Sequence, residues 1–311
     1  MKILVTGGAG FIGSTIVDRY IEEGHSVVVV DNESSGKRAQ VNKKAVFVRL
    51  DVRDRKKVGQ LVHKHRFHVI NHHAAQIDVR HSVADPHHDA HVNIMGTLNL
   101  LEAAQTSKVK KFIFSASGGT AYGNCSRPAR EGDPEVPLSP YGVTKLAGEK
   151  YIQTFSSLYG FKFTIFRYAN VYGPRQDPHG EAGVVAIFSN KLLENESPFI
   201  FGTGRQTRDY VFVGDVAHAN VLALSKGDNQ TLNIGTGIET SVLALWNKMA
   251  SIRGASPRLI YKPLRPGELQ RSVLSYSKAK KELGWAPSTR LKEGLSATLS
   301  FFEEKRQAVS R

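Results

Sequence analysis

The stretch that most restricts how this chain can fold is "TGGAGFIG" at residues 6–13, which lies between an apolar β-branched run and a helical pattern. Gly7, Gly10 and Gly13 permit a tight turn, close approach of a ligand to the backbone, and close packing of a helix on a strand. The N-terminus of the following helix offers N–H groups and a positive dipole end. The stretch therefore predicts a strand–turn–helix unit that binds a pyrophosphate.

Asp31 ends the second strand-like run, downstream of that turn. An acid at this place usually binds the adenosine ribose hydroxyls, and its negative charge repels a 2′-phosphate. Asp31 thus favours NAD over NADP, and a turn aspartate with no ligand is the alternative interpretation. The third strand-like run ends at Asp51 and Val52, which we expect to border the adenine.

The first half of the chain alternates strand-like and helix-like segments. The strand-like runs are 2–7, 26–31, 45–51, 68–74, 111–117 and 162–168, and amphipathic segments separate them. Strict alternation of this kind predicts an α/β fold with a doubly wound parallel sheet, the Rossmann arrangement, whose site lies at the carboxyl ends of the strands. After Tyr168 the alternation is lost, which predicts a smaller α/β substrate-binding lobe. We place the NAD-binding domain at 1–168 plus about 211–234, and the second lobe at about 169–210 and 235–311.

The bulk composition is that of a soluble globular protein with an excess of positive charge. The formal net charge is +14, with basic residues scattered along the chain, which favours a basic solvated surface over a nucleic-acid site. No apolar run approaches the ~18 residues of a membrane helix, and no export signal is recognisable. Cys125 is the only cysteine, which excludes an internal disulfide and fits a cytoplasmic location. We expect no metal site, because the histidines near residues 72–73 and 87–91 fit solvated or structural positions.

Two Tyr-x-x-x-Lys pairs occur in the chain, Tyr141 with Lys145 and Tyr276 with Lys280. On a helix such residues share one face, one turn apart. The spacing alone does not distinguish a proton-transfer pair from two surface residues, because roughly one such pair is expected by chance at ordinary composition. The sequence context has to separate the two pairs.

That context resembles the extended short-chain dehydrogenases/reductases, specifically the nucleotide-sugar 4-epimerase group. The resemblance spans essentially the whole chain, and it rests on "TGGAGFIG", Asp31, "SASGGTAYG" (115–123), "YGVTK" (141–145), "RYANVYGPRQDPHGEAG" (167–183) and "RDYVFVGDVAHA" (208–219). It implies that Tyr141 is the acid/base and Lys145 its electrostatic partner, whereas Tyr276 and Lys280 are structural. A homodimer through helices near 88–106 and 141–159 is implied as well.

The same resemblance implies the remaining roles in the site. A hydroxyl beside the phenol shares the proton of the substrate; Ser117 is our choice and Thr120 the alternative. The expected cofactor-binding residues are Gly7, Gly10, Phe11, Ile12, Gly13, Asp31, Asn32, Asp51, Val52, Ala74, Tyr141, Lys145 and Tyr168. The expected substrate-binding residues are Ser117, Thr120, Asn170, Arg208, Arg265, Glu268 and Ser272. The planar forks of the two arginines suit a diphosphate.

A tyrosine needs help to act as a base, because a free phenol titrates near 10. Lowering its pKa by ~3 units requires about 4 kcal/mol of stabilisation of the phenolate. The ammonium of Lys145 and a positively charged nicotinamide are both suitable sources. A base of nearly neutral pKa is the most effective at cellular pH.

The reaction follows from residues that are missing. Relatives that eliminate water or remove a carboxylate resemble this chain but have acidic residues just after the fifth strand, where this chain has Gly118, Gly119, Thr120 and Ala121. We therefore expect C4 epimerisation of a UDP-hexose with bound NAD through a 4-keto intermediate. Ser272 stands where a bulky tyrosine excludes an N-acetyl group in relatives, so UDP-GlcNAc and UDP-GalNAc are also expected substrates.

Three departures from the family pattern affect the sugar site. Glu268 and Ser275 stand where aspartates are usual, and Asp78 replaces a small residue near the expected hexose. Two other functions stay open: a different NAD-dependent nucleotide-sugar oxidoreductase, and a non-catalytic NAD-binding regulator. The presence of Ser117, Tyr141 and Lys145 disfavours the regulator.

Overall fold

A seven-stranded parallel sheet forms the centre of the larger lobe in our computed structural model, which describes residues 1–178, 183–255, 257–264 and 269–309. The strand order is β10-β6-β5-β4-β1-β2-β3, and each neighbouring pair is parallel. The strands are β1 (Lys2–Thr6), β2 (Ser26–Asp31), β3 (Val46–Arg49), β4 (Val69–His72), β5 (Lys111–Ser117), β6 (Lys162–Tyr168) and β10 (Gln230–Ile234).

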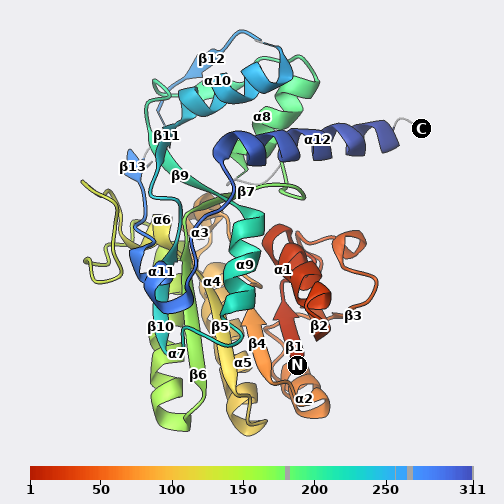
Figure 1. Ribbon diagram of the computed structural model, residues 1–311. Helices are drawn as coiled ribbons and strands as arrows, with labels where there is room; N and C mark the ends of the chain where they lie inside the picture. The colour runs from red at the N-terminus through yellow and green to blue at the C-terminus, as the bar shows by residue number, and fades with distance from the viewer. Residues whose placement is uncertain (179–182, 256, 265–268, 310–311) are drawn as a thin grey trace.

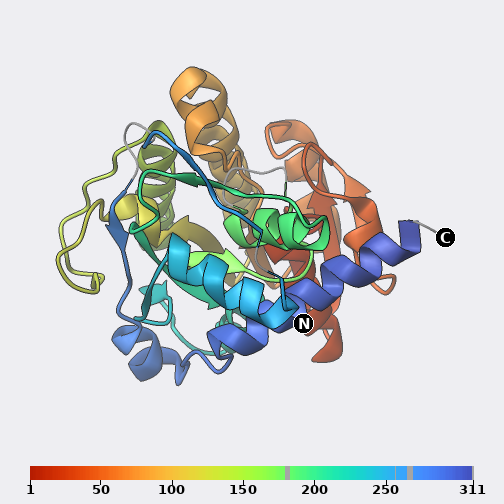
Figure 2. The ribbon, with the colours of Figure 1, turned by 90° about the horizontal axis from the view of Figure 1, so that it is seen from above.

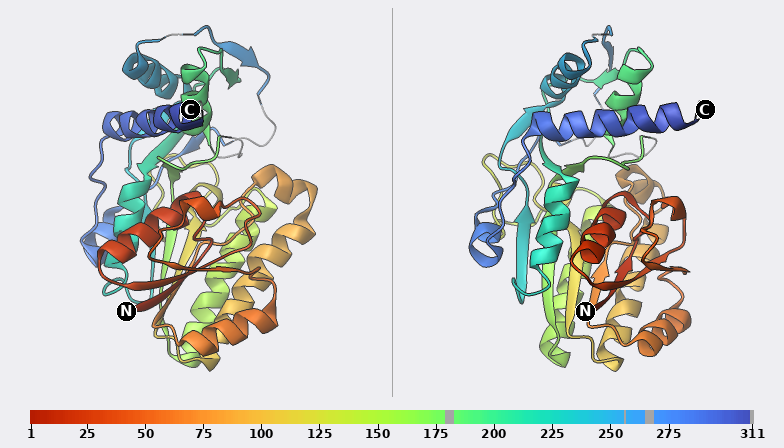
Figure 3. Two further views of the ribbon diagram at one scale, coloured as in Figure 1. Left: turned by 90° about the vertical axis from the view of Figure 1, so that its right-hand side faces the viewer. Right: turned by 45° about the vertical axis from the view of Figure 1, so that its right-hand side comes forward.

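Helices cover both faces of this sheet (Figure 3). One layer holds α1 (Phe11–Glu22), α9 (Val213–Leu222) and α11 (Ser277–Leu283), and the other holds α2 (Arg55–His65), α5 (Gly96–Thr106) and α7 (Pro140–Tyr159). Successive side chains of a strand point to opposite faces, so Ile3 and Val5 join the first core while Leu4 joins the second. A parallel sheet buried on both faces confirms the predicted fold class.

Helix α7 carries the tyrosine–lysine pair, and local sequence defines both of its ends. The Oγ atom of Ser139 accepts a hydrogen bond from the N–H of Gly142 at 3.2 Å, and Pro140 occupies the first helical position. Both are favoured helix-start residues. Gly160 ends the helix in the left-handed conformation, at φ 79°. Twenty residues of helix are thereby held against β5 and β6.

Short helical segments fill the connections that border the carboxyl ends of the strands. Between β4 and α5 lie α3 (Val79–Ala84), α4 (Pro86–Ala90) and the π-helical turn η2 (His91–Met95). Between β5 and α7 lies α6 (Gly118–Ala121), and between β2 and β3 lies the 3₁₀ turn η1 (Arg38–Gln40). None of the helices in the described ranges is long and apolar enough to cross a membrane.

The smaller lobe lies beyond the carboxyl ends of the sheet (Figures 1 and 2). Its four-stranded sheet pairs β9 (Thr207–Phe212) with β7 (Asn170–Tyr172), β11 (Glu239–Ser241) and β13 (Arg271–Ser272), and a second small sheet pairs β8 (Phe199–Phe201) with β12 (Ile260–Lys262). The helices α8 (Val184–Leu193), α10 (Val242–Arg253) and α12 (Leu291–Val309) pack into one core there. Figure 2 shows α12 crossing this lobe toward the C-terminus.

The order of the strands locates the site. Chain order reverses between β1 and β4, which lie side by side at the centre of the sheet. In open α/β sheets a ligand binds outside the carboxyl ends of the strands at such a switch point. The glycine turn after β1, the segment after β4 and Ser117 at the end of β5 all meet this edge.

Candidate active site

The glycine turn is folded so tightly that side chains are excluded from it. Gly7 adopts φ 68°, and a Cβ atom there would lie 2.6 Å from the N atom of Ala74. A Cβ atom on Gly13 would lie 2.2 Å from the carbonyl oxygen of Gly7. No side chain caps the start of α1 at Gly10, so the N–H groups of Phe11 and Ile12 stand at an uncapped helix N-terminus. This cradle fits the pyrophosphate of a dinucleotide.

Asp31 ties the glycine turn to the end of β2. Its Oδ2 atom accepts the N–H of Ala9 at 3.0 Å, and its Oδ1 atom accepts the N–H of Glu33 at 2.8 Å. The carboxylate is buried, and a Cβ atom on Gly36 would lie 2.9 Å from Oδ2. A carboxylate held this rigidly beside the turn suits a ribose diol and opposes an added phosphate.

The residues expected to border the adenine form a polar rim at the next strand. The Nδ2 atom of Asn32 donates to Asp51 Oδ2 at 2.9 Å, and Arg53 contacts both oxygens of Asp51, at 3.0 and 2.7 Å. The hydrogen bond from Arg53 lowers the pKa of Asp51 strongly. Val52 is buried, and its Cγ2 atom leaves no room for a Cβ atom on Gly96, 2.7 Å away.

Tyr141 and Lys145 lie one turn apart on α7, as the spacing predicted. The N–H of Tyr141 donates to Ser82 Oγ at 3.1 Å. The Nζ atom of Lys145 is buried; it donates to the carbonyl oxygen of Ser115 at 2.9 Å and lies 4.9 Å from the centroid of the Phe114 ring. Both side chains therefore face the end of β5.

Burial shifts the pKa values of Lys145 and Tyr141 in opposite directions. It lowers the pKa of Lys145 to about 8, while the negative charges of Asp89 and Glu149 oppose the fall. It raises the pKa of Tyr141, Asp89 raises it further, and a hydrogen bond with Ser117 acts in the lowering direction. Burial is the largest of these influences on Tyr141, and it disfavours the phenolate.

The hydroxyls beside the phenol come from the end of β5 and from α6. Ser117 hydrogen-bonds to Tyr141, whereas the buried Oγ1 atom of Thr120 has no hydrogen-bond partner among the described residues. A Cβ atom on Gly118 would lie 2.4 Å from Leu274 Cδ1, so a carboxylate side chain does not fit there unless Leu274 moves. The geometry favours Ser117 beside the acid/base and leaves Thr120 able to bind a ligand hydroxyl.

Tyr168 ends β6 directly beside Ser117, with which its Cα atom is paired. Its hydroxyl receives the Nδ2–H of Asn220 at 2.9 Å and lies 3.1 Å from His73 Nε2. His73 precedes Ala74, whose N–H donates to Thr6 Oγ1 at 3.3 Å. The strand ends β1, β4, β5 and β6 thus present one continuous polar edge.

The substrate residues of the smaller lobe share its four-stranded sheet. Asn170 pairs with Tyr210 between β7 and β9, and Ser272 pairs with Arg208 between β13 and β9. A Cβ atom on Gly119 would lie 3.5 Å from Ser272 Oγ, so Ser272 reaches across to the segment that follows Ser117. Arg265 and Glu268 lie outside the described residues. Asp78 caps α3 by accepting the N–H of His81 at 2.9 Å.

The second Tyr-x-x-x-Lys pair lies elsewhere. Tyr276 precedes α11, and its ring packs edge-on against Trp285 at a centroid distance of 6.1 Å. Lys280 lies on the short helix α11 itself. Neither residue stands at the edge that holds Tyr141.

Several buried charged residues behind the site were not anticipated from the sequence. Asp89 is buried beneath α7, and Glu149 pairs with the buried Arg167 at 2.6 Å. Asp89 belongs to the polar stretch "DPHHDAHVN", which resembles an exposed helix start, so its burial could not be predicted from that pattern. Glu149 stands one turn after Lys145 on the buried face of α7, and that helical spacing was the signal that could have identified it.

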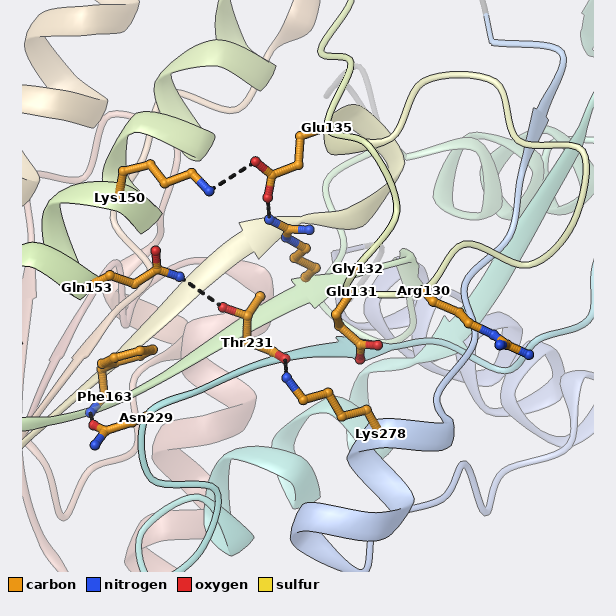
Figure 4. A pocket seen from close by; sticks show the side chains of 11 residues that line it. Arg130, Glu131, Gly132, Glu135, Lys150, Gln153, Phe163, Asn229, Thr231 and Lys278 are labelled. Carbon is orange, nitrogen blue, oxygen red and sulfur yellow. Dashed lines mark hydrogen bonds and ion pairs between the residues drawn. The ribbon is translucent and has the colours of Figure 1, made fainter.

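A charged cavity of about 450 Å³ lies apart from this edge, beside β6 and β10 (Figure 4). Glu135 pairs with two of its cations, Lys150 at 3.1 Å and Arg167. Lys278 donates instead to the backbone carbonyl oxygen of Thr231 at 3.1 Å. None of the expected site residues lines it. Within the described ranges, no group of three His, Cys, Asp or Glu side chains is arranged to hold a metal ion.

Comparison with known proteins gives consistent matches. The model of the NAD dependent epimerase/dehydratase family matches residues 3–235. A putative UDP-glucose 4-epimerase of Methanocaldococcus jannaschii is 47% identical over 302 residues, which are 97% of this chain and 98% of that protein. The crystal structure of UDP-glucose 4-epimerase from Thermotoga maritima with UDP-glucose is 48% identical, covers 98% and 100% of the two chains, and has a TM-score of 0.97. UDP-N-acetylglucosamine 4-epimerase from Methanobrevibacter ruminantium is 32% identical over 98% of each chain, with a TM-score of 0.92.

Proposed function

This chain belongs to the NAD-dependent epimerase/dehydratase family, and we propose that it interconverts UDP-glucose and UDP-galactose at C4. The observation that carries the proposal is Tyr141, hydrogen-bonded to Ser117 and one turn from the buried Lys145, at the strand edge that also holds the glycine cradle. The family membership itself confirms the resemblance predicted from the motifs.

The cofactor in this proposal is NAD, which supplies a hydride acceptor that can return the hydride within one cycle. Gly7, Gly10 and Gly13 form the pyrophosphate cradle, with Phe11 and Ile12 at the start of α1. Asp31 binds the adenosine ribose, and Asn32, Asp51 and Val52 border the adenine. Ala74, Tyr168 and Lys145 lie toward the reactive end, where the ammonium of Lys145 suits the second ribose.

Tyr141 moves the proton. Its phenolate accepts the proton of the sugar 4-hydroxyl, and the same phenol returns it once the keto group is reduced on the opposite face. Ser117 bridges the two oxygens by hydrogen bonds, and Lys145 stabilises the phenolate. Because burial and Asp89 raise the pKa of Tyr141, the phenol loses its proton efficiently only when further positive charge is present in the site. This dependence links proton transfer to an occupied cofactor site.

The nucleotide diphosphate lies between the lobes in this proposal. Asn170 and Arg208, on β7 and β9, contact it, together with Arg265 and Glu268 outside the described residues. Asp78 is an expected neighbour of the hexose, although its carboxylate already caps α3. We retain the predicted lobe boundaries, 1–168 plus about 211–234 for the first lobe, as part of the proposal.

Sugars with an N-acetyl group are proposed as additional substrates. Ser272 is buried and lies next to Gly119, so a small hydroxyl side chain faces the segment that follows Ser117. Accepting an acetamido group requires free volume, whereas a tyrosine at this place fills it. The similarity to a UDP-N-acetylglucosamine 4-epimerase supports the same extension.

A homodimer through the helices near 88–106 and 141–159, which correspond to α4, η2, α5 and α7, is a further part of the proposal. Helix α7 exposes four large apolar or aromatic side chains, Val143, Tyr151, Leu158 and Tyr159. Such residues are unusual on a free helix surface when they recur on one element. Burying them against a second copy would remove this apolar surface from water.

The deciding experiment uses pure protein without added cofactor. UDP-glucose and UDP-N-acetylglucosamine are incubated separately, and the 4-epimer is followed by proton NMR. We expect both epimers to form with no net NADH. Stoichiometric oxidised sugar with released NADH would instead indicate the alternative oxidoreductase, and bound NAD without turnover of either sugar would indicate a regulator.

A further inference from the structure

Asp89, at the end of α4, is a carboxylate with 0% exposure that binds neither the cofactor nor the substrate in the function proposed above. Gln76 Nε2 donates to its Oδ1 atom at 2.9 Å, Asn93 Nδ2 donates to the same atom at 3.1 Å, and Thr144 Oγ1 donates to its Oδ2 atom at 2.7 Å. Three neutral donors on two oxygens stabilise the ionised form of a carboxyl group. The side chains that donate to Asp89 within the described ranges are thus all neutral.

The partners of Asp89 connect it to the tyrosine–lysine pair. Thr144 lies directly before Lys145 on α7, and its Oγ1 atom is also 3.1 Å from the carbonyl oxygen of Tyr141. Asn93 Nδ2 lies 3.2 Å from the same Oγ1 atom and donates to the carbonyl oxygen of Gln76 at 3.0 Å. Asn93 belongs to the π-helical turn η2, and single π-turns are frequent at functional sites.

We propose that Asp89 is a positioning residue for Tyr141 and Lys145: its buried negative charge keeps Lys145 an ammonium ion, and its hydrogen bond to Thr144 holds the start of α7. The catalytic consequence rests on the proposed function. A buried ammonium without a nearby anion loses its proton readily, and Asp89 supplies that anion without forming the close ion pair that would draw Lys145 away from the carbonyl oxygen of Ser115.

The electrostatic influence of Asp89 agrees with this geometry. Burial lowers the pKa of Lys145, and the charge of Asp89 is the largest influence that raises it; Asp89 also raises the pKa of Tyr141. Other charged or titratable groups lie on or next to the elements that pack around Asp89. Those around α3, α4 and η2 are Arg80, His81, His87, His88 and His91, with Asp78 and Asp85 at the helix caps. Glu149 lies on α7, and His72 and His73 lie on and directly after β4. Arg80, His81, His87 and His91 are exposed, so water screens them.

An asparagine substitution separates the charge from the contacts. In Asp89→Asn the amide oxygen still accepts from Gln76 and Asn93, and the amide N–H donates to Thr144 Oγ1, whose own proton turns toward the carbonyl oxygen of Tyr141. The matched control is Asp85→Asn, four residues earlier, because Asp85 is exposed and caps α4 through the N–H of His88 at 2.9 Å. Both variants remove one negative charge.

The test measures protonation directly in NAD-saturated protein. Carbon-13 NMR of labelled lysine and tyrosine, with Lys145→Met and Tyr141→Phe to assign the signals, follows both titrations. We expect Asp89→Asn to lower the titration midpoint of Lys145 by about one pH unit, to lower that of Tyr141, and to move the alkaline limb of the kcat profile to lower pH by a similar amount. Unchanged midpoints, or equal shifts in Asp85→Asn, would overturn the proposal.

The NMR titrations are independent of turnover. Full activity of Tyr141→Phe would contradict the proposed function. The effect of Asp89→Asn on the titration of Lys145 would still be tested independently of that outcome.

Discussion

The stability of the folded protein depends on the buried ion pair between Glu149 and Arg167, which lies beneath the site. Arg167 is 2% exposed and Glu149 is 1% exposed. Arg167 donates to Glu149 through Nε at 2.9 and 3.2 Å and through one terminal nitrogen at 2.6 Å; it also contacts Tyr122 and Glu135. Burial disfavours the charged guanidinium, but the hydrogen bonds and charge of Glu149 outweigh burial and raise the pKa of Arg167.

Glu149→Gln keeps the shape of the side chain and removes its charge, leaving a buried guanidinium without its main partner. Breaking a buried pair in this way usually costs about 3–5 kcal/mol. Because Glu135 still contacts the guanidinium, we expect the lower end, about 3 kcal/mol in the free energy of unfolding. Replacing both charges, as in Glu149→Leu with Arg167→Met, should recover much of that loss.

The assay is urea unfolding followed by circular dichroism at a fixed concentration of NAD, so that ligand binding contributes equally in each variant. Glu102→Gln is the control, since it breaks a surface pair with Arg55 at 2.7 Å whose side chains are 43% and 75% exposed. We expect that control to cost less than about 1 kcal/mol. A loss in Glu149→Gln no larger than in Glu102→Gln would refute the reasoning.

Four further predictions test the site. Tyr141→Phe should lower kcat by roughly 10²–10⁴ with an unchanged unfolding midpoint, and a larger loss in Tyr276→Phe would mean that the wrong pair was chosen. Asp31 should make NAD bind more tightly than NADP in a direct titration, and equal affinities would contradict its role. Ser272→Tyr should abolish turnover of UDP-N-acetylglucosamine and spare that of UDP-glucose. Equal loss of both activities would argue against a role of Ser272 in admitting the acetamido group. Burial lowers the pKa of Lys145 from 10.5 to about 8, so between these pH values the unfolded chain binds more protons than the folded protein. The stability of the wild type relative to Lys145→Met should therefore rise with pH across this range, by up to about 3 kcal/mol at 1.36 kcal/mol per pH unit. An equal stability difference at both ends of the range, measured by urea unfolding, refutes this.

Features of this protein that depend on neighbouring residues in the chain could be predicted from local sequence. The glycine turn, Asp31 at the end of β2 and the tyrosine–lysine spacing on α7 could all be predicted, because turn sterics, strand ends and the helical repeat act over a few residues. The fold class followed from the same local alternation, and the parallel sheet confirms it. The N-cap of α7 at Ser139 and its C-terminal Gly160 are equally local.

The distant groups that act on Tyr141 and Lys145 could be identified only from the folded chain. Asp89 reaches α7 because α4 packs against that helix. Ser272 is held beside β9 in the smaller lobe by the pairing of β13, and from there it reaches Gly119 of the larger lobe. The sequence also indicated an ammonium near Tyr141 but not how completely the phenol is buried, and burial raises its pKa. Burial and long-range electrostatics are sums over residues far apart in the chain, and no local pattern carries them.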